Sequence, residues 1–250
     1  MTVAELHGKI PTLEGREDLL TSDVFSAFRY LPVNLAPIPF LRKAIHAQTA
    51  KPIHNLFEDC LAVDYIFWPK TTYYKREPDL ILLITCKTKP PIAIIIEAKY
   101  YSGRHDVNRE QAEKELQALQ GDQLAEQYVD LMKNEIDLNK QQKQMLQEAD
   151  HRFLLFVTAH DVLPRKITDD SINKLTKQNY KGDHLYWINW QAAFDVANEA
   201  LATQILPDEQ RFILEDLRDL LLRKGLTSFQ GFHLPAKLLQ PKHYFWREEQ

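Results

Sequence analysis

The stretch REPDLILLITCKTKPPIAIIIEAKYY, residues 76–101, contains two nearly continuous apolar runs, DLILLITC at 79–86 and PIAIIIEAKYY at 91–101. Continuous apolar runs are typical of strands that are buried on both faces of a sheet covered by helices. The segment between them, KTKPP at 87–91, has the polar and proline content of a turn. The stretch therefore predicts a β-hairpin at the centre of an α/β domain.

Three ionisable residues meet at the open end of this predicted hairpin. Asp79 begins the first run, and Glu97 and Lys99 end the second. With the turn centred within KTKPP, Asp79 lies opposite Ala98 and is flanked by Glu97 and Lys99. Residues two apart on a strand point to the same face, so Glu97 and Lys99 share one face.

Carboxylates at the end of a buried sheet lose hydration and repel each other, so they require a compensating cation. Lys99 supplies one positive charge, and a divalent metal ion would supply more. The carboxylates of Asp79 and Glu97, the backbone carbonyl of Ala98 and water form the oxygen ligand set that Mg²⁺ prefers, with Mn²⁺ as a substitute. Such a site can activate water against a phosphate, with Lys99 orienting that water. The alternative is a salt-bridged strand end without a metal.

The segments REPDLILLI and IIIEAK together resemble the signature of the PD-(D/E)XK nuclease superfamily. The resemblance implies a restriction-endonuclease-like αβββαβ core over about residues 14–160, with a mixed central sheet flanked by helices. Residues 161–250 would form a C-terminal helix–strand–helix extension, and the whole chain, 1–250, one nuclease-like domain. The implied activity is Mg²⁺- or Mn²⁺-dependent hydrolysis of phosphodiester bonds, with DNA as the expected partner.

The resemblance also nominates Glu17, because members carry an acidic residue on the first core helix that completes the metal site. Glu17 lies in GREDLLTSDVFSAFRYLP, and Asp18 is the less favoured candidate. The alternative for Glu17 is a simple charge at a helix N-terminus.

Many members also place a glutamine on the helix after the lysine, and Gln123 in GDQLAEQY fits this role. RecB-like members have Gln and Tyr four residues apart, whereas Tyr128 follows Gln123 by five and Gln127 by one. The chain departs from the pattern here, and the alternative for Gln123 is a solvated helix face.

Other side chains near the hairpin are candidates for nucleic-acid contact, by stacking on bases or by binding phosphates. They are Tyr73, Tyr74, Tyr100, Tyr101, Lys70, Lys75, Arg76, Arg104 and Arg109. The alternatives are ordinary packing for the tyrosines and solvated surface charge for the basic residues. His160 and Asp161 follow a predicted strand and either line the cleft or belong to a plain loop.

Elsewhere the apolar spacing predicts alternating helices and strands. Helices are expected at 17–31, 40–48, 52–62, 108–147, 167–178, 191–203 and 208–224, and further strands at 63–69, 152–159 and 185–190. Short turns join the first three strands, so these should pair antiparallel, and the fourth follows a helix and can pair parallel.

Composition is that of a globular protein, with 250 residues, 44% hydrophobic and 26% charged. A net charge of −4 argues against a bulk polyanion binder but allows a local basic surface. Cys60 and Cys86 are expected to be buried free thiols in a reducing compartment. No hydrophobic leader or membrane-length apolar run is found, so a cytoplasmic protein without a membrane partner is expected.

Two alternatives to an active nuclease remain open. The chain can be a catalytically silent member of the superfamily, a structural or DNA-binding subunit of a larger complex. The segments EDLLTSxVFxxxRYLP and QLAEQY also resemble bacterial proteins from phage-defence or mobile-element systems, in which protein partners or a homodimer are possible. The second alternative is an unrelated α/β binding protein in which the motif arises by chance.

Overall fold

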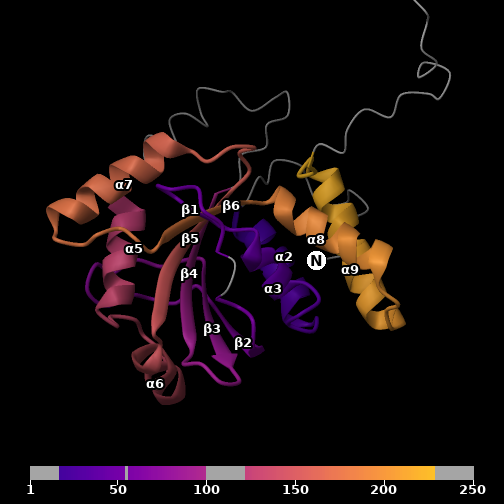
Figure 1. The fold of residues 1–250 in the computed structure, drawn as a ribbon, viewed down its shortest axis with the longest axis horizontal. Helices are drawn as coiled ribbons and strands as arrows, with labels where there is room; N and C mark the ends of the chain where they lie inside the picture. The colour runs from indigo at the N-terminus through magenta and orange to yellow at the C-terminus, as the bar shows by residue number, and fades with distance from the viewer. Residues whose placement is uncertain (1–16, 54–55, 100–121, 229–250) are drawn as a thin grey trace, which may run out of the picture.

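The computed structural model describes residues 17–53, 56–99 and 122–228. Within these residues, six strands form one mixed sheet in the order β1-β6-β5-β4-β3-β2. Helices cover both faces of this sheet (Figure 1). The predicted α/β class, with a mixed central sheet flanked by helices, is confirmed.

The strands and helices have the following bounds. The strands are β1 (Ile45–His46), β2 (Cys60–Phe67), β3 (Leu80–Cys86), β4 (Ile92–Lys99), β5 (His151–Thr158) and β6 (Leu185–Asn189). The helices are α2 (Glu17–Arg29), α3 (Pro37–Arg42), α5 (Asp122–Met132), α6 (Lys140–Glu148), α7 (Arg165–Lys177), α8 (Gln191–Thr203) and α9 (Asp208–Arg223).

Strand pairing agrees with the predicted directions for β2, β3, β4 and β5. β2, β3 and β4 pair antiparallel, and β4, β5 and β6 pair parallel. The short β1 pairs antiparallel with β6 at the far edge of the sheet. The carboxyl ends of β4, β5 and β6 therefore lie at one end of the sheet, and β3 begins at the same end.

The central strands β3 and β4 are buried on both faces, as their continuous apolar runs predict. Even-numbered residues such as Leu82 and Ile94 belong to a hydrophobic cluster with α2, α3, α8 and α9. Odd-numbered residues such as Ile81 and Ile95 belong to a second cluster with α5, α6 and α7. Side chains alternate along a strand, so the sheet separates two helical layers, which we call the α2 layer and the α5 layer.

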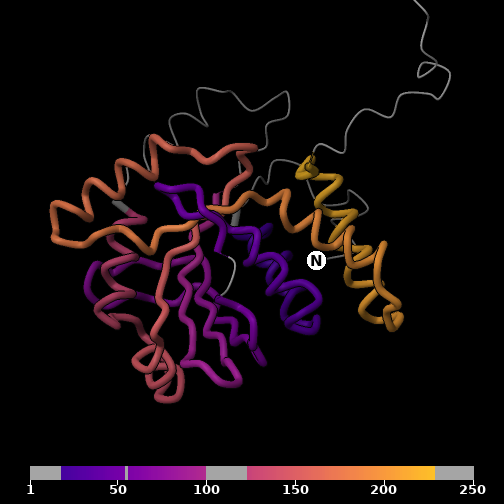
Figure 2. Tube along the Cα trace, in the orientation of Figure 1, coloured from indigo at the N-terminus to yellow at the C-terminus, as the bar shows by residue number. Residues whose placement is uncertain are grey.

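Aromatic packing joins α2 to the start of α8 in the α2 layer. The ring of Phe25 on α2 lies edge-to-face against Trp190, at 6.1 Å between ring centroids, where α8 begins. Figure 2 shows the N-terminal helices in indigo beside the C-terminal helices in orange and yellow. The helix predicted at 17–31 is confirmed as α2, with its end at Arg29.

The single long helix predicted at 108–147 is wrong in its described part, since α5 and α6 are separate helices. Asn134, just after α5, has a positive φ of 58°, a conformation that asparagine tolerates better than most residues. Asn139 then caps α6, with its side chain accepting from Gln142 N–H and the Gln142 side chain accepting in return. Residues 108–121 of the prediction lie outside the described residues.

The helices predicted at 40–48 and 52–62 are also displaced or wrong. α3 covers Pro37–Arg42, whose prolines suit the first turn of a helix. The second segment forms a bridge between Ile45 and Pro52, a turn, and then the start of β2.

Cys60 and Cys86 are free thiols that lie opposite each other on β2 and β3. Cys86 is buried as predicted, whereas Cys60 is only half-buried. Burial raises the pKa of both thiols, that of Cys60 to about 12. No helix in the described part of the chain combines the length and apolar character needed to cross a bilayer.

The two-sided burial of β3 can be tested with a matched pair of leucine substitutions. Leu83 is fully buried on β3, and Leu61 on the neighbouring β2 is 58% exposed. Leu83→Ala should lower the free energy of unfolding by about 2–5 kcal/mol, because it removes core contacts and leaves a cavity. Leu61→Ala should change it by less than about 0.5 kcal/mol. Urea denaturation followed by circular dichroism measures both, and equal losses would contradict this placement of Leu83.

Candidate active site

Asp79, Glu97 and Lys99 face the same helical layer. Leu80 pairs with Ile96, so continuing the ladder places Asp79 opposite Glu97. The predicted pairing of Asp79 with Ala98 is therefore wrong by one residue. A slip of one residue turns a side chain to the other face of a sheet, and the observed register brings all three ionisable residues toward the α5 layer.

Asp79 is 7% exposed and lies against the end of β4. Its carboxylate Oδ2 accepts a hydrogen bond from the backbone N–H of Ala98 at 2.7 Å. This N–H belongs to the residue between Glu97 and Lys99, so the Asp79 carboxylate contacts the backbone between these two residues. The backbone carbonyl of Asp79 accepts from Trp68 N–H at 3.1 Å, which holds the start of β3 to the end of β2.

Glu97 is more deeply buried than Asp79, at 1% exposure. Its Oε1 lies 2.9 Å from the Lys99 ammonium nitrogen. Its Oε2 accepts a hydrogen bond from the side-chain amide of Gln127 on α5, at 2.8 Å. A buried carboxylate is therefore held between a cation on its own strand and an amide on the covering helix.

The Oε1 atom of Glu97 has ion-pair distance to Lys99 but no partner with hydrogen-bond geometry. We treat the contact as an ion pair, because a short N–O distance alone does not make a hydrogen bond. Carboxylate oxygens have about four lone-pair sites in total. Glu97 thus keeps acceptor capacity at a buried position, which fits a further cationic ligand.

Lys99 ends β4 and is held through its backbone from both sides. It pairs with Thr158 on β5, and its carbonyl accepts from the Trp190 indole N–H at 3.3 Å. Trp190 is fully buried in the α2 layer. The position of the Lys99 side chain therefore depends on the packing of the whole C-terminal part of the fold.

The glutamine of α5 whose side chain contacts Glu97 is Gln127, and the predicted role of Gln123 stays a prediction. Gln127 is fully buried, whereas Gln123 is half-buried one turn earlier on α5. Within the described residues, the side chain of Gln123 makes no hydrogen bond. The sequence contains a signal for Gln127, because it shares the helical spacing of the buried Leu124 and Leu131. A polar residue within an apolar stripe requires a buried partner.

The remaining proposed metal ligands are placed only in part. Glu17 begins α2, but its side chain lies outside the description, so its role stays a prediction. Asp18 is exposed. The side chain of Ala98 packs in the α2 layer, and the role of its carbonyl also stays a prediction. Among the described residues, no group of three or more His, Cys, Asp or Glu gathers to hold a metal ion.

Asp79 and Glu97 thus contribute a set of two carboxylates. The buried acceptor capacity of Glu97 and the hard oxygen chemistry of both residues fit Mg²⁺ or Mn²⁺, which accept several water ligands alongside one or two carboxylates.

The other candidates for substrate contact lie in different places. Lys70 and Lys75 are exposed in the loop between β2 and β3. Asp161, after β5, accepts from the Gln191 side chain at 3.0 Å, and burial lowers the pKa of His160. Four further candidates from the sequence fall outside the described residues. They are Tyr100, Tyr101, Arg104 and Arg109.

Comparisons with known proteins return no match, whether the chain is set against family models, curated proteins or solved structures. Any function assigned to the chain therefore depends on the residues and contacts described above.

The two glutamines of α5 can be separated by experiment. Gln127→Ala should lower the free energy of unfolding by about 1–3 kcal/mol, since it removes the amide donor from a buried carboxylate. Gln123→Ala, the matched control on the same helix, should change it by less than about 0.5 kcal/mol. Chemical denaturation of both variants measures the difference. A larger loss for Gln123→Ala would reverse the assignment.

Proposed function

We propose that the chain is a metal-dependent nuclease that hydrolyses phosphodiester bonds, with DNA as the substrate. The observation that carries the proposal is the buried Glu97 carboxylate, held by Lys99 and Gln127 next to the buried carboxylate of Asp79. Lysine beside two acidic residues, all at the open end of a hairpin, is an arrangement suited to hydrolysis assisted by a cation.

Charge at the site supports this reading. Among the described residues, two carboxylates and one lysine meet at a position largely removed from water, so acidic groups outnumber basic ones there. Each buried ion costs several kcal/mol unless partners compensate for lost hydration. A strand end with a purely structural role is served equally well by apolar residues, so this concentration of charge indicates a cationic ligand.

Each residue of the site has a task in the proposed reaction. Asp79 and Glu97 would hold Mg²⁺ or Mn²⁺, with the carbonyl of Ala98 and Glu17 as further ligands. The metal would supply Lewis acidity toward a phosphate oxygen and make water more acidic. Lys99 orients the attacking water and neutralises charge that develops on the phosphate. Gln127 keeps the Glu97 carboxylate in one orientation.

The order of elements supports the resemblance to PD-(D/E)XK nucleases. Along the chain, α2, β2, β3, β4, α5 and β5 follow in the αβββαβ order, with α3, β1 and α6 as short additions. Asp79 precedes the second strand of this series, and Glu97 and Lys99 end the third. We therefore infer a restriction-endonuclease-like core, extended by α7, β6, α8 and α9.

The ion pair between Lys99 and Glu97 favours one alternative. Because the ammonium already compensates Glu97, the site is also compatible with a catalytically silent member of the superfamily. Such a protein would serve as a structural or DNA-binding subunit of a larger complex, for example in a phage-defence or mobile-element system.

Cleavage assays with single-residue variants test the proposal. Asp79→Asn, Glu97→Gln and Lys99→Ala should each lower the rate of DNA cleavage in Mg²⁺ or Mn²⁺ at least about 100-fold, because each removes a group that acts on the reacting phosphate or water. Chelation of the metal should have the same effect. Asp64→Asn, an exposed acidic residue on β2, is the matched control and should cleave as the wild type does.

A second readout does not depend on activity. Titration of Mn²⁺ by calorimetry should show binding to the wild type and to Asp64→Asn, and much weaker binding to Asp79→Asn and Glu97→Gln. Folded variants that retain both metal binding and cleavage would overturn the proposal. Metal binding without cleavage would favour the silent alternative.

A further inference from the structure

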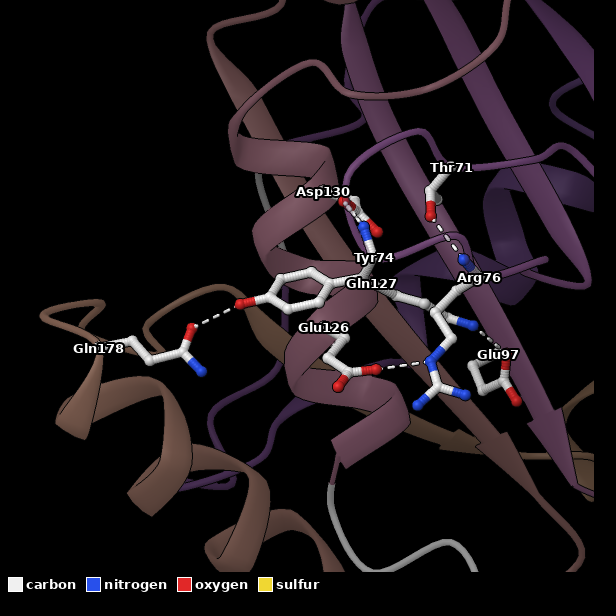
Figure 3. A network of polar contacts seen from close by, with 8 residues as sticks. All are labelled: Thr71, Tyr74, Arg76, Glu97, Glu126, Gln127, Asp130 and Gln178. Carbon is white, nitrogen blue, oxygen red and sulfur yellow. Dashed lines mark hydrogen bonds and ion pairs between the residues drawn. The ribbon is translucent and has the colours of Figure 1, made fainter.

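The loop that leads into Asp79 runs along α5 and is tied to this helix and to the residues that directly follow it. Three contacts define this path, and they are Thr72 N–H to the Glu135 carbonyl at 2.8 Å, Tyr74 N–H to the Asp130 carboxylate at 3.2 Å, and Arg76 Nε–H to the Glu126 carboxylate at 2.5 Å. As the loop advances toward Asp79, its partners move toward the N-terminus of α5 (Figure 3). Arg76 therefore contacts α5 at Glu126, next to the residue that binds Glu97.

Arg76 is linked to the site through two parts of the chain, α5 and its own loop. Its partner Glu126 is the chain neighbour of Gln127, which holds Glu97. Consecutive Cα atoms are about 3.8 Å apart, so one helical turn of α5 binds both the Arg76 guanidinium and the Glu97 carboxylate. Arg76 also precedes Asp79 by three residues, and its backbone N–H is fixed by the Thr71 hydroxyl at 2.8 Å.

The Arg76 guanidinium is anchored on one side and open on the other. Only Nε contacts Glu126, and within the described residues the two terminal nitrogens make no hydrogen bond. The side chain is 42% exposed. The terminal fork of a guanidinium matches two oxygens of a phosphate group, and a carboxylate on Nε leaves that fork available.

A purely structural role explains these contacts less well. A partly exposed ion pair contributes on the order of 1 kcal/mol to folding. The loop is already tied to α5 by Tyr74 and to the segment after α5 by Thr72. The Glu126 contact adds little to that attachment. Its specific effect is to hold the guanidinium in one direction beside a site that would act on phosphodiesters.

We propose that Arg76 binds a phosphodiester of the nucleic-acid strand next to the bond that Asp79, Glu97 and Lys99 would cleave, and that Glu126 is the positioning residue for this contact. The choice of ligand rests on the proposed nuclease function. A contact to a phosphate carries no sequence information in itself, so Arg76 would serve affinity and placement of the strand.

Binding can be measured without cleavage, using a fluorescein-labelled DNA duplex with Ca²⁺ in place of Mg²⁺ and anisotropy as the readout. Arg76→Ala should weaken binding about tenfold and lower the slope of log affinity against log salt concentration by about one. Arg76→Lys should keep the slope, because it keeps the charge, and should weaken binding less.

Arg218→Ala is the matched control. Arg218 also pairs with a carboxylate and is partly exposed, but it lies on α9 in the α2 layer. This variant should bind DNA within about twofold of the wild type and keep its salt slope.

Glu126→Gln tests the positioning role through a double-mutant cycle. If Glu126 directs the fork, the difference in affinity between arginine and lysine at position 76 should fall below about twofold in the Glu126→Gln background. An unchanged difference would remove Glu126 from the proposal.

The outcomes separate this inference from the nuclease proposal. An unchanged salt slope and affinity for Arg76→Ala overturns the role of Arg76, even where the wild type cleaves DNA. If Arg76→Ala loses binding and neither the wild type nor any variant cleaves DNA, the nuclease proposal is overturned and Arg76 remains a phosphate-binding residue. Absence of DNA binding by the wild type overturns the inference.

Discussion

The hydrogen bond between Gln127 and Glu97 is the contact on which the rest of the site depends. Glu97 ends a strand whose other residues are almost all apolar, and its carboxylate is nearly inaccessible to water. A buried charge is tolerated only where partners replace its hydration. Lys99 provides one partner from the same strand, and α5 provides the other through Gln127. The positions of the strand end and the covering helix are therefore coupled. A shift of either one would expose the Glu97 carboxylate or remove its hydrogen bond to Gln127.

Register is the second constraint, and polar groups set it. Residues of β3 and β4 are apolar on both faces, so a slip of one residue exchanges one set of buried apolar side chains for another. Hydrophobic patterning alone specifies such a pairing weakly. The ends of the hairpin supply the missing information. Asp79 finds the Ala98 N–H at one end, and at the other the Thr88 N–H donates to the carboxylate of Asp59 at 2.8 Å. In this register Asp79 shares a face with Glu97.

This explains which parts of the molecule could be predicted from the sequence. The apolar runs predicted β3, β4 and β5, because burial on both faces leaves a clear compositional signal. The direction in which these strands pair was predicted from the connections between them, which are short turns or contain a helix. The trio of Asp79, Glu97 and Lys99 was predicted because its polarity contrasts with those runs. The hairpin register was missed by one residue, since both strands are apolar on both faces and their pattern does not distinguish one pairing from the next.

Local chemistry explains the errors in the helices. The break between α5 and α6 depends on Asn134 and on the Asn139 cap, which compete with a helical pattern that would otherwise continue. Partners of the site could not be predicted in the same way. Arg76 and Glu126 are 50 residues apart in the chain, and only the folded path of the loop along α5 brings them together. The rotation of α5 is set by apolar residues such as Leu124 and Leu131, which fix where Glu126 and Gln127 point. Packing of this helix thus directs both the carboxylate of the candidate metal site and the guanidinium beside it, so that two polar contacts with different tasks share one hydrophobic support.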